Sequence, residues 1–293
     1  MGDPASRRRR RRRFVLTCAA AAAILGGGFG SARAQAQAQS GQDAAAAARP
    51  AGVDPAVLDD IASASRILAD LGVLDGFGHV TARHSANPNR FLMSRSLAPA
   101  LVTPDDVMEF DLDGNPVDAR GRAVFLERFI HAEIYKARPD VNAVIHTHSA
   151  GVIPFGVSTV ALRPMYHNAA FLGAGVPVFD IRTAAGGPTD MLVRNSALGK
   201  ALAETLADKP VALMRGHGDV VVGPTVQVAT FRAYYTDVNA RLEAQAIGLG
   251  GSGEINFLTP EESTKADATN LQILGRAWDL WKRRVSGGAS GRP

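Results

Sequence analysis

Cysteine is nearly absent from this sequence of 293 residues. The single cysteine, Cys18, lies near the N-terminus, in a segment that we expect to be removed from the mature protein. The mature chain then has no thiol that could form a disulfide or bind a metal. Its stability must therefore come from a hydrophobic core or from a metal held by other side chains.

An excess of basic charge is also missing once the N-terminus is set aside. Residues 1–34 contain eight arginines and one aspartate, a net charge of +7, whereas the whole chain has a formal net charge of +4. The remaining residues therefore carry 4 − 7 = −3. This excludes the basic surface that nucleic-acid-binding proteins use, so we expect no nucleic-acid partner.

No apolar run is long enough for a stable membrane span. The run Phe14–Gly30 is short and rich in alanine and glycine, follows the basic block Arg7–Arg13, and precedes an A-x-A site at 32–34. This order is typical of a secretory signal. Residues Arg11–Leu16 also fit a twin-arginine signal, with the general secretory route as the alternative. We expect residues 1–34 to be a signal peptide and the mature protein to be periplasmic, without membrane contact.

Large apolar side chains are scarce in residues 35–52, which we expect to form a disordered linker. Residues 53–250 have the size of one α/β domain, and residues 251–293 are expected to form a C-terminal helical extension and tail. Apolar spacing predicts helices at 55–71, 125–137, 226–247 and 260–284, and short strands at 80–83, 90–93, 107–112, 142–148, 210–215 and 219–222. Alternating strands and helices favour a layered α/β domain.

Histidines at three places in the chain indicate a metal site. In the motif His146-Thr147-His148, on a predicted strand, both imidazoles project from the same face. His217 lies between two glycines at a strand end, where backbone can approach a bound group. Such imidazoles hold Zn²⁺, Mn²⁺ or Fe²⁺, although each could instead be a structural or turn histidine. Glu127 and His131 share one predicted helix face, either at the metal site or as a surface hydrogen bond.

The same segments resemble the class II aldolase/adducin family. Glu127–His131 and Arg138–His148 are similar to the core motif of that family, and Gly216-His217-Gly218 is similar to its third-histidine segment. The motifs match in order and approximate spacing, and the resemblance covers residues 57 to 250.

This resemblance implies a three-layer α/β/α fold around a central mixed, largely antiparallel sheet. It implies one divalent ion per subunit, Zn²⁺, Mn²⁺ or Fe²⁺, on His146, His148 and His217. Glu127 matches an acid that is a metal ligand in some members and a general acid/base in others. The resemblance also implies a homo-oligomer, with a homotetramer as the expected form.

The sequence departs from the sugar-phosphate aldolases at their phosphate pocket. Gly78-His79-Val80-Thr81 stands where those enzymes have a Gly-Asn-(Val/Ile)-Ser turn, and Phe125-Leu126 stands where they have a Ser-Ser pair. A phosphate needs several N–H or O–H donors, so the loss of these donors argues against a phosphorylated substrate.

Other residues replace the phosphate pocket. Arg95 could bind a carboxylate bidentately, with His79 and Ser94 as further donors, or it could be a solvated loop charge. Phe125, together with Phe77 and Leu126, could form an apolar wall for a flat or aromatic substrate, or could simply pack in the core.

These replacements resemble a branch of the family outside sugar metabolism. That branch includes decarboxylases of hydroxylated aromatic or pyridine dicarboxylates. By the same resemblance, Tyr166 or His167 is expected near the site as a proton donor, and Tyr235 is a weaker candidate. Each of these side chains could instead be a buried, hydrogen-bonded residue.

The sequence therefore predicts a metal-dependent carbon–carbon lyase, a decarboxylase or aldolase, that acts on a small non-phosphorylated hydroxy- or keto-acid. Both reactions leave electrons on a carbon next to an oxygen, which a divalent Lewis acid would stabilise. One alternative is a non-haem Fe(II) oxygenase, because three imidazoles also suit iron. Another is a non-catalytic binding module like the adducin head, although the retention of all three histidines argues against it.

Overall fold

The computed structural model describes residues 49–50, 52–250 and 255–286, which all lie in one compact unit spanning residues 43–293. The predicted signal peptide, residues 1–34, and most of the predicted linker, residues 35–52, lie outside the described residues.

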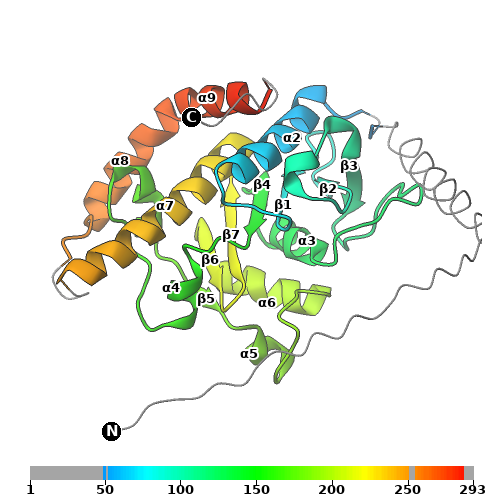
Figure 1. Ribbon diagram of the computed structural model, residues 1–293. Coiled ribbons are helices and arrows are strands. Elements are labelled where there is room, and N and C mark those ends of the chain that lie inside the picture. Colours follow the sequence, from blue (N-terminus) through cyan, green and yellow to red (C-terminus); the bar gives the residue numbers. More distant parts are fainter. Residues whose placement is uncertain (1–48, 51, 251–254, 287–293) are drawn as a thin grey trace, which may run out of the picture. The chain divides into compact units, whose positions relative to one another are not determined.

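A seven-stranded sheet forms the centre of this unit, in the order β3-β2-β1-β4-β7-β6-β5 (Figure 1). Neighbouring strands are antiparallel except for β5 and β6, which are parallel. The sheet is therefore mixed and largely antiparallel, which confirms the prediction. The strands are β1 (His79–Arg83), β2 (Arg90–Ser94), β3 (Val107–Asp111), β4 (Ala143–Thr147), β5 (Val178–Phe179), β6 (Val211–Met214) and β7 (Gly218–Gly223).

Helices cover both faces of the sheet and enclose a separate core on each. The first core packs α2 (Pro55–Asp70), α7 (Val226–Gly250) and α9 (Gly275–Ser286) on one face, and the second packs α3 (Arg128–Ala137) and α6 (Ser196–Leu206) on the other (Figure 1). In β4, Ala143 and Ile145 belong to the first core and Val144 to the second, because successive side chains of a strand point to opposite faces. The fold thus has three layers, α/β/α.

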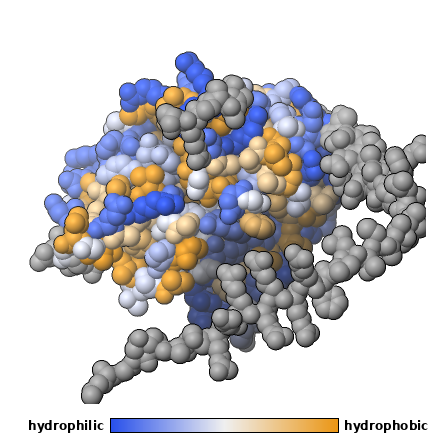
Figure 2. Space-filling view, viewed as in Figure 1, coloured by the Kyte–Doolittle hydropathy of each residue, from blue (hydrophilic) through white to orange (hydrophobic). Residues whose placement is uncertain are grey.

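The remaining described helices are η1 (Pro99–Leu101), η2 (Pro104–Asp106), α4 (Ile153–Val157), η3 (His167–Ala174), α5 (Ile181–Ala185) and α8 (Pro260–Ile273). None of the described helices combines the length and the apolar content that a membrane span requires. Hydrophilic and hydrophobic side chains are interspersed on the face shown in Figure 2.

The C-terminal helices differ from the single helix predicted over residues 260–284. The helix is interrupted at Leu274, which separates α8 from α9. A capping box between Thr259 and Glu262 starts α8, and α9 buries Trp278 and Trp281 in the first core beside α2 and α7. These helices therefore pack against the same unit as the sheet.

Candidate metal centre and adjoining cavity

Four side chains that can bind a metal converge from three parts of the chain. Glu127 immediately precedes α3, His146 and His148 lie on and just after β4, and His217 lies in the turn between β6 and β7. Antiparallel pairing of β4 with β7 brings that turn to the end of β4. Glycine is required at position 218, because a Cβ there would overlap the carbonyl oxygen of the neighbouring β4 strand.

The ligand atoms of this cluster point at a common centre. The Nε2 atom of His148 lies 3.1 Å from Nε2 of His146 and 3.0 Å from Nε2 of His217. The Glu127 Oε2 atom lies 3.5 Å from Nε2 of His146 and from Nε2 of His217, and all four ligand atoms lie within 4.8 Å of one another. Ligands about 2.0–2.1 Å from a tetrahedral ion are separated by about 3.3 Å. The spacing fits one metal ion.

Hydrogen bonds outside the cluster orient two of these groups. The Nδ1 atom of His146 donates to the carbonyl oxygen of Asp219 at 2.9 Å, so the Nε2 lone pair faces the centre. The backbone N–H of Val193 donates to Glu127 Oε1 at 2.9 Å, which leaves Oε2 for the centre. Such bonds fix ring tautomer and carboxylate orientation before a cation binds.

The protonation states also suit a cation. Burial alone would raise the pKa of Glu127, but its contacts with the His146 and His217 rings outweigh burial and hold this pKa well below its usual range. Burial and the neighbouring imidazoles lower the pKa of His148 to about 4. Metals bind ionised carboxylates and neutral imidazoles. Glu127, His146, His148 and His217 can therefore hold one divalent ion.

A cavity of about 440 Å³ opens beside the cluster, where Glu127 and His148 form part of its wall. Most of the remaining wall is apolar or backbone, and none of the described lining residues is a lysine or an arginine. The lining residues are Gly76, Phe77, Gly78, His79, Ser96, Leu97, Ala98, Phe125, Leu126, Glu127, His148 and Leu192. A flat, mainly apolar molecule would fit this space better than a phosphorylated sugar.

Two of the four predicted substrate-binding residues line this cavity and two do not. His79 and Phe125 lie in its wall, with their ring centroids 4.7 Å apart. Ser94 is buried at the end of β2, and the Arg95 guanidinium is paired with Asp106 at 2.6 Å. The pair uses Nε of Arg95, and carboxylate binding by this side chain stays a prediction.

The predicted proton donors lie on another part of the molecule. Tyr166 packs against Tyr235 on α7 with 6.2 Å between ring centroids, and its buried hydroxyl has no partner among the described residues. His167 is exposed, and its carbonyl oxygen accepts a hydrogen bond from Asn270 on α8. Neither side chain lines the cavity in this chain, so their catalytic roles stay predictions.

A buried contact between His79 and His131 was not predicted from the sequence. The predicted helix 125–137 begins only at Arg128, so Glu127 has non-helical φ and ψ angles of −90° and 17° and does not share a helix face with His131. The His131 ring instead contacts His79, with Nε2 2.6 Å from Nδ1 of His79. Thr81, two residues after His79 on β1, points to the same face and joins this contact. The spacing of His79 and Thr81 on one strand is the feature of the sequence that could have indicated a shared buried contact.

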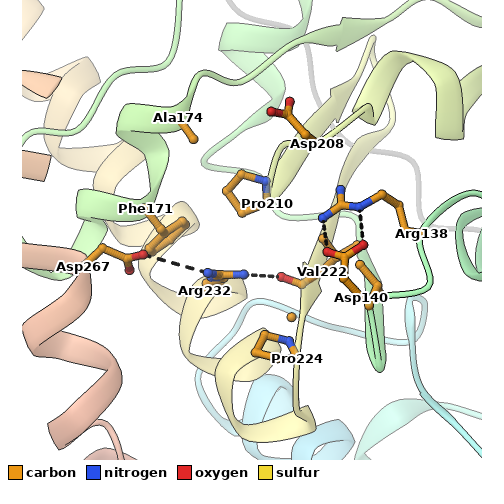
Figure 3. Close-up of a pocket in the computed structure, with 12 residues that line it drawn as sticks. Arg138, Asp140, Phe171, Ala174, Asp208, Pro210, Val222, Pro224, Arg232 and Asp267 are labelled. Atoms are coloured by element: carbon orange, nitrogen blue, oxygen red, sulfur yellow. Dashed lines mark hydrogen bonds and ion pairs between the residues drawn. The ribbon is translucent and has the colours of Figure 1, made fainter. Parts of the chain in front are cut away.

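A second cavity, of about 430 Å³, shares no lining residue with the first (Figure 3). Four of its five charged side chains form two pairs with one another, and the fifth, Asp208, pairs with Lys209 outside the lining. Arg138 pairs with both carboxylate oxygens of Asp140, while Arg232 donates to the carbonyl oxygen of Val222 at 2.8 Å and lies 4.0 Å from Asp267. None of its described lining residues is a histidine or a cysteine, and the metal cluster lies beside the first cavity.

Comparisons with known proteins agree with this geometry. A family model described as Class II Aldolase and Adducin N-terminal domain matches residues 59–244. The chain is 37% identical over 246 residues to the decarboxylase tropJ of Talaromyces stipitatus, with 77% of this chain and 92% of that protein covered. It is 34% identical over 209 residues to a 3,4-dihydroxyphthalate decarboxylase of Arthrobacter keyseri, with 66% and 79% covered.

A solved structure supports the fold. An aldolase II superfamily protein from Pseudomonas syringae aligns with a TM-score of 0.68 at 23% identity, with 82% of this chain and 96% of that chain covered. Together with the two decarboxylases, the family match supports a lyase of the aldolase or decarboxylase kind. The chain belongs to the class II aldolase and adducin family.

Proposed function

We propose that this protein is a divalent-metal-dependent carbon–carbon lyase that decarboxylates a small, non-phosphorylated, hydroxylated aromatic acid. The observation that carries the proposal is the Glu127, His146, His148 and His217 cluster at the wall of an apolar cavity. The described lining offers no cationic side chain, so a substrate carboxylate would need the metal as its positive partner. Two relatives named as decarboxylases favour loss of CO₂ over aldol cleavage.

The residues around the cavity have separate tasks in this proposal. Phe125 and Leu126 would hold a ring flat and exclude water, and His79 would contact a polar substituent. A divalent ion bound by the cluster would act as a Lewis acid on an oxygen next to the reacting carbon. Glu127 is ionised and either completes the coordination or moves a proton.

Decarboxylation breaks the bond between a ring carbon and its carboxylate, CO₂ leaves, and the ring carbon takes up a proton. Tyr166 and His167 remain proposals for the donor of this proton. Within one chain Glu127 lines the cavity and they do not, but its carboxylate is ionised, so it would first have to take a proton from a substrate hydroxyl before it could pass one to the ring carbon.

The direct test is release of CO₂ from 3,4-dihydroxyphthalate by the mature protein under anaerobic conditions, with Zn²⁺, Mn²⁺ or Fe²⁺ added in turn. We expect equal amounts of CO₂ and a dihydroxybenzoate with one of these metals. The double variant His146→Ala/His148→Ala should release none while keeping its circular dichroism spectrum. No CO₂ from this compound or from a panel of other hydroxylated aromatic acids would contradict the proposal.

Other outcomes identify the alternatives. Cleavage of a non-phosphorylated aldol without CO₂ would indicate an aldolase. Turnover that depends on Fe²⁺ and consumes oxygen would indicate an oxygenase. A mature protein that contains no metal, and that no metal stabilises, would favour the binding module.

We also propose that the mature protein is a periplasmic homotetramer exported by the twin-arginine route. Light scattering should give about four times the mass of the mature chain. Replacing Arg11 and Arg12 by lysine should block export of the full-length protein. Unchanged export in that variant would point to the general secretory route.

A further inference from the structure

A row of buried polar side chains runs from the cavity into the second core. His79 lines the cavity, and its Nδ1 atom lies 2.6 Å from Nε2 of His131. The other His131 nitrogen, Nδ1, lies 2.8 Å from the hydroxyl of Thr81, which lies 2.8 Å from the hydroxyl of Tyr135 and 3.2 Å from the carbonyl oxygen of Val144. His131, Thr81 and Tyr135 are at most 1% exposed.

The protons in this row can be assigned by counting donors and acceptors. A neutral imidazole has one N–H and one lone pair, and a hydroxyl has one proton and two lone pairs. If Thr81 donates to Val144, it accepts from Tyr135 and from Nδ1–H of His131, and Nε2 of His131 accepts from Nδ1–H of His79. All four contacts are then hydrogen bonds.

The opposite arrangement makes one hydrogen bond fewer. If Thr81 donates to His131 instead, Nε2–H of His131 donates to His79, and the contact between Thr81 and Val144 has no proton. A buried acceptor site without a donor is unfavourable, and hydrogen bonds in a buried row strengthen one another. The first arrangement is therefore the more stable one, and it leaves Nε2 of His79 unprotonated.

From this geometry we infer that Thr81 and His131 are positioning residues that fix His79 as a hydrogen-bond acceptor facing the cavity, so that the site selects a substrate with a hydroxyl group at that point. The inference rests on the proposed function for its substrate class, a hydroxylated aromatic acid, and adds the group that recognises the hydroxyl. The Phe125 ring beside His79 would hold the rest of the substrate against this contact.

The row does not supply protons from solvent. It ends at Tyr135, whose ring packs against Phe91 in the second core, and burial raises the pKa of its hydroxyl well above the usual value. A net proton leaving through His79 would leave a buried tyrosinate behind, which is costly. The row therefore sets an orientation and a tautomer.

The tautomer can be measured without turnover and without metal. In metal-free protein labelled with ¹⁵N-histidine, the ¹⁵N shifts separate a protonated ring nitrogen from a bare one, and loss of a signal in His79→Gln assigns His79. We expect both His79 and His131 to carry their proton on Nδ1. A His79 that carries its proton on Nε2 would overturn the inference.

A second experiment tests the acceptor itself with two probes, 3,4-dihydroxybenzoate and benzoate, titrated into Zn²⁺-loaded protein in a calorimeter. Thr81→Val removes the hydroxyl at nearly constant volume, so we expect about tenfold weaker binding of 3,4-dihydroxybenzoate and unchanged binding of benzoate. Thr230→Val is the matched control, because in the described part of the chain the buried Thr230 hydroxyl donates within α7, to the carbonyl oxygen of Val226. It should leave the binding of both probes unchanged.

Equal weakening of both probes in Thr81→Val, or weakening of neither, would refute the selective contact. Because neither experiment measures CO₂, failure of the proposed reaction can be told apart from failure of this inference. A protein that shows the expected tautomer and probe preference but releases no CO₂ would keep the acceptor and lose the decarboxylase.

Discussion

Glu127 divides its two carboxylate oxygens between the protein backbone and the metal cluster. One oxygen accepts from the N–H of Val193, and the other lies 3.5 Å from the Nε2 atoms of His146 and His217. Glutamine in its place could keep the backbone bond but would bring an uncharged amide to the centre. The substitution Glu127→Gln therefore removes the negative charge while the shape of the side chain is nearly kept.

We expect Glu127→Gln to lower kcat about 100-fold or more, because either a proton carrier or a negative ligand is lost. Metal content measured by mass spectrometry then distinguishes the roles: retained metal indicates an acid/base, and lost metal indicates a ligand. Glu133→Gln is the matched control, since Glu133 lies on α3 and pairs with Lys136. Wild-type kcat in Glu127→Gln would exclude both roles.

Glu243 is a buried carboxyl that ties α7 to the segment before η3. It accepts from the backbone N–H of Arg163, its other oxygen is buried without a partner among the described residues, and burial raises its pKa to about 7. Because the folded pKa exceeds the unfolded value, the unfolded chain ionises first. The contribution of protonated Glu243 to the free energy of unfolding is therefore fully present below about pH 4.5, and it is lost as the pH rises to about 7.

Glu243→Gln should remove this loss. Between pH 5 and pH 8 we expect the free energy of unfolding of the variant to gain roughly 2 kcal/mol relative to the wild type. Urea denaturation across that range measures the difference, with the exposed Glu204→Gln on α6 as control. Parallel pH profiles for wild type and Glu243→Gln would show that Glu243 does not titrate in this range.

At the level of single residues, the histidines of the cluster could be predicted because the local backbone conformation determines where their side chains point. Strand alternation puts His146 and His148 on one face, and two glycines put His217 in a tight turn. The contact between His79 and His131 joins β1 to α3 across 52 positions, and the Arg95 ion pair joins the residue after β2 to the end of η2. Only the tertiary fold determines such long-range pairs.

Among the elements, α9 shows how far the C-terminal residues contribute to the core. Trp278 and Trp281 are each 7% exposed and pack with α2 and α7, whereas Leu280 on the same helix is 58% exposed. Removing a buried tryptophan side chain loses its apolar contacts and leaves a cavity.

Trp281→Ala should therefore lower the free energy of unfolding by about 3 kcal/mol or more, and Leu280→Ala should change it by less than about 0.5 kcal/mol. Chemical denaturation of both variants, monitored by circular dichroism, tests this. Equal and small effects would mean that α9 is only loosely attached in solution.

The elements that the sequence predicted are α2, α3, α7 and the six longer strands, although α3 begins at Arg128 and not at Phe125. It missed β5, which has two residues, and gave no prediction for α6, although α6 forms part of the second core. It also merged α8 and α9, because the break at Leu274 falls within a continuous helical pattern with no proline. Short strands and such breaks depend on tertiary packing.

For the molecule as a whole, the absence of cysteine from residues 35–293 excludes disulfides, so stability rests on the core and on any metal that the cluster binds. A ligand that binds only the folded state stabilises it by about 4 kcal/mol at a concentration 1,000 times its Kd. The cluster brings together residues from the start of α3, the end of β4 and the β6–β7 turn. An ion held there would therefore connect α3 to strands at the centre of the sheet.

We therefore expect Zn²⁺ or Mn²⁺, added to metal-free mature protein, to raise Tm by roughly 10 °C, given a few degrees for each kcal/mol at this chain length. His146→Ala/His148→Ala should show no rise, because the cluster has lost two imidazoles. Trp281→Ala should start from a lower Tm yet show the same rise, since Trp281 packs with α2 and α7, which contribute none of the four cluster residues, and the effects of separate sites add. An equal rise in the double variant would place the stabilising metal elsewhere, and no rise in the wild type would show that the cluster, though well formed, does not hold an ion in solution.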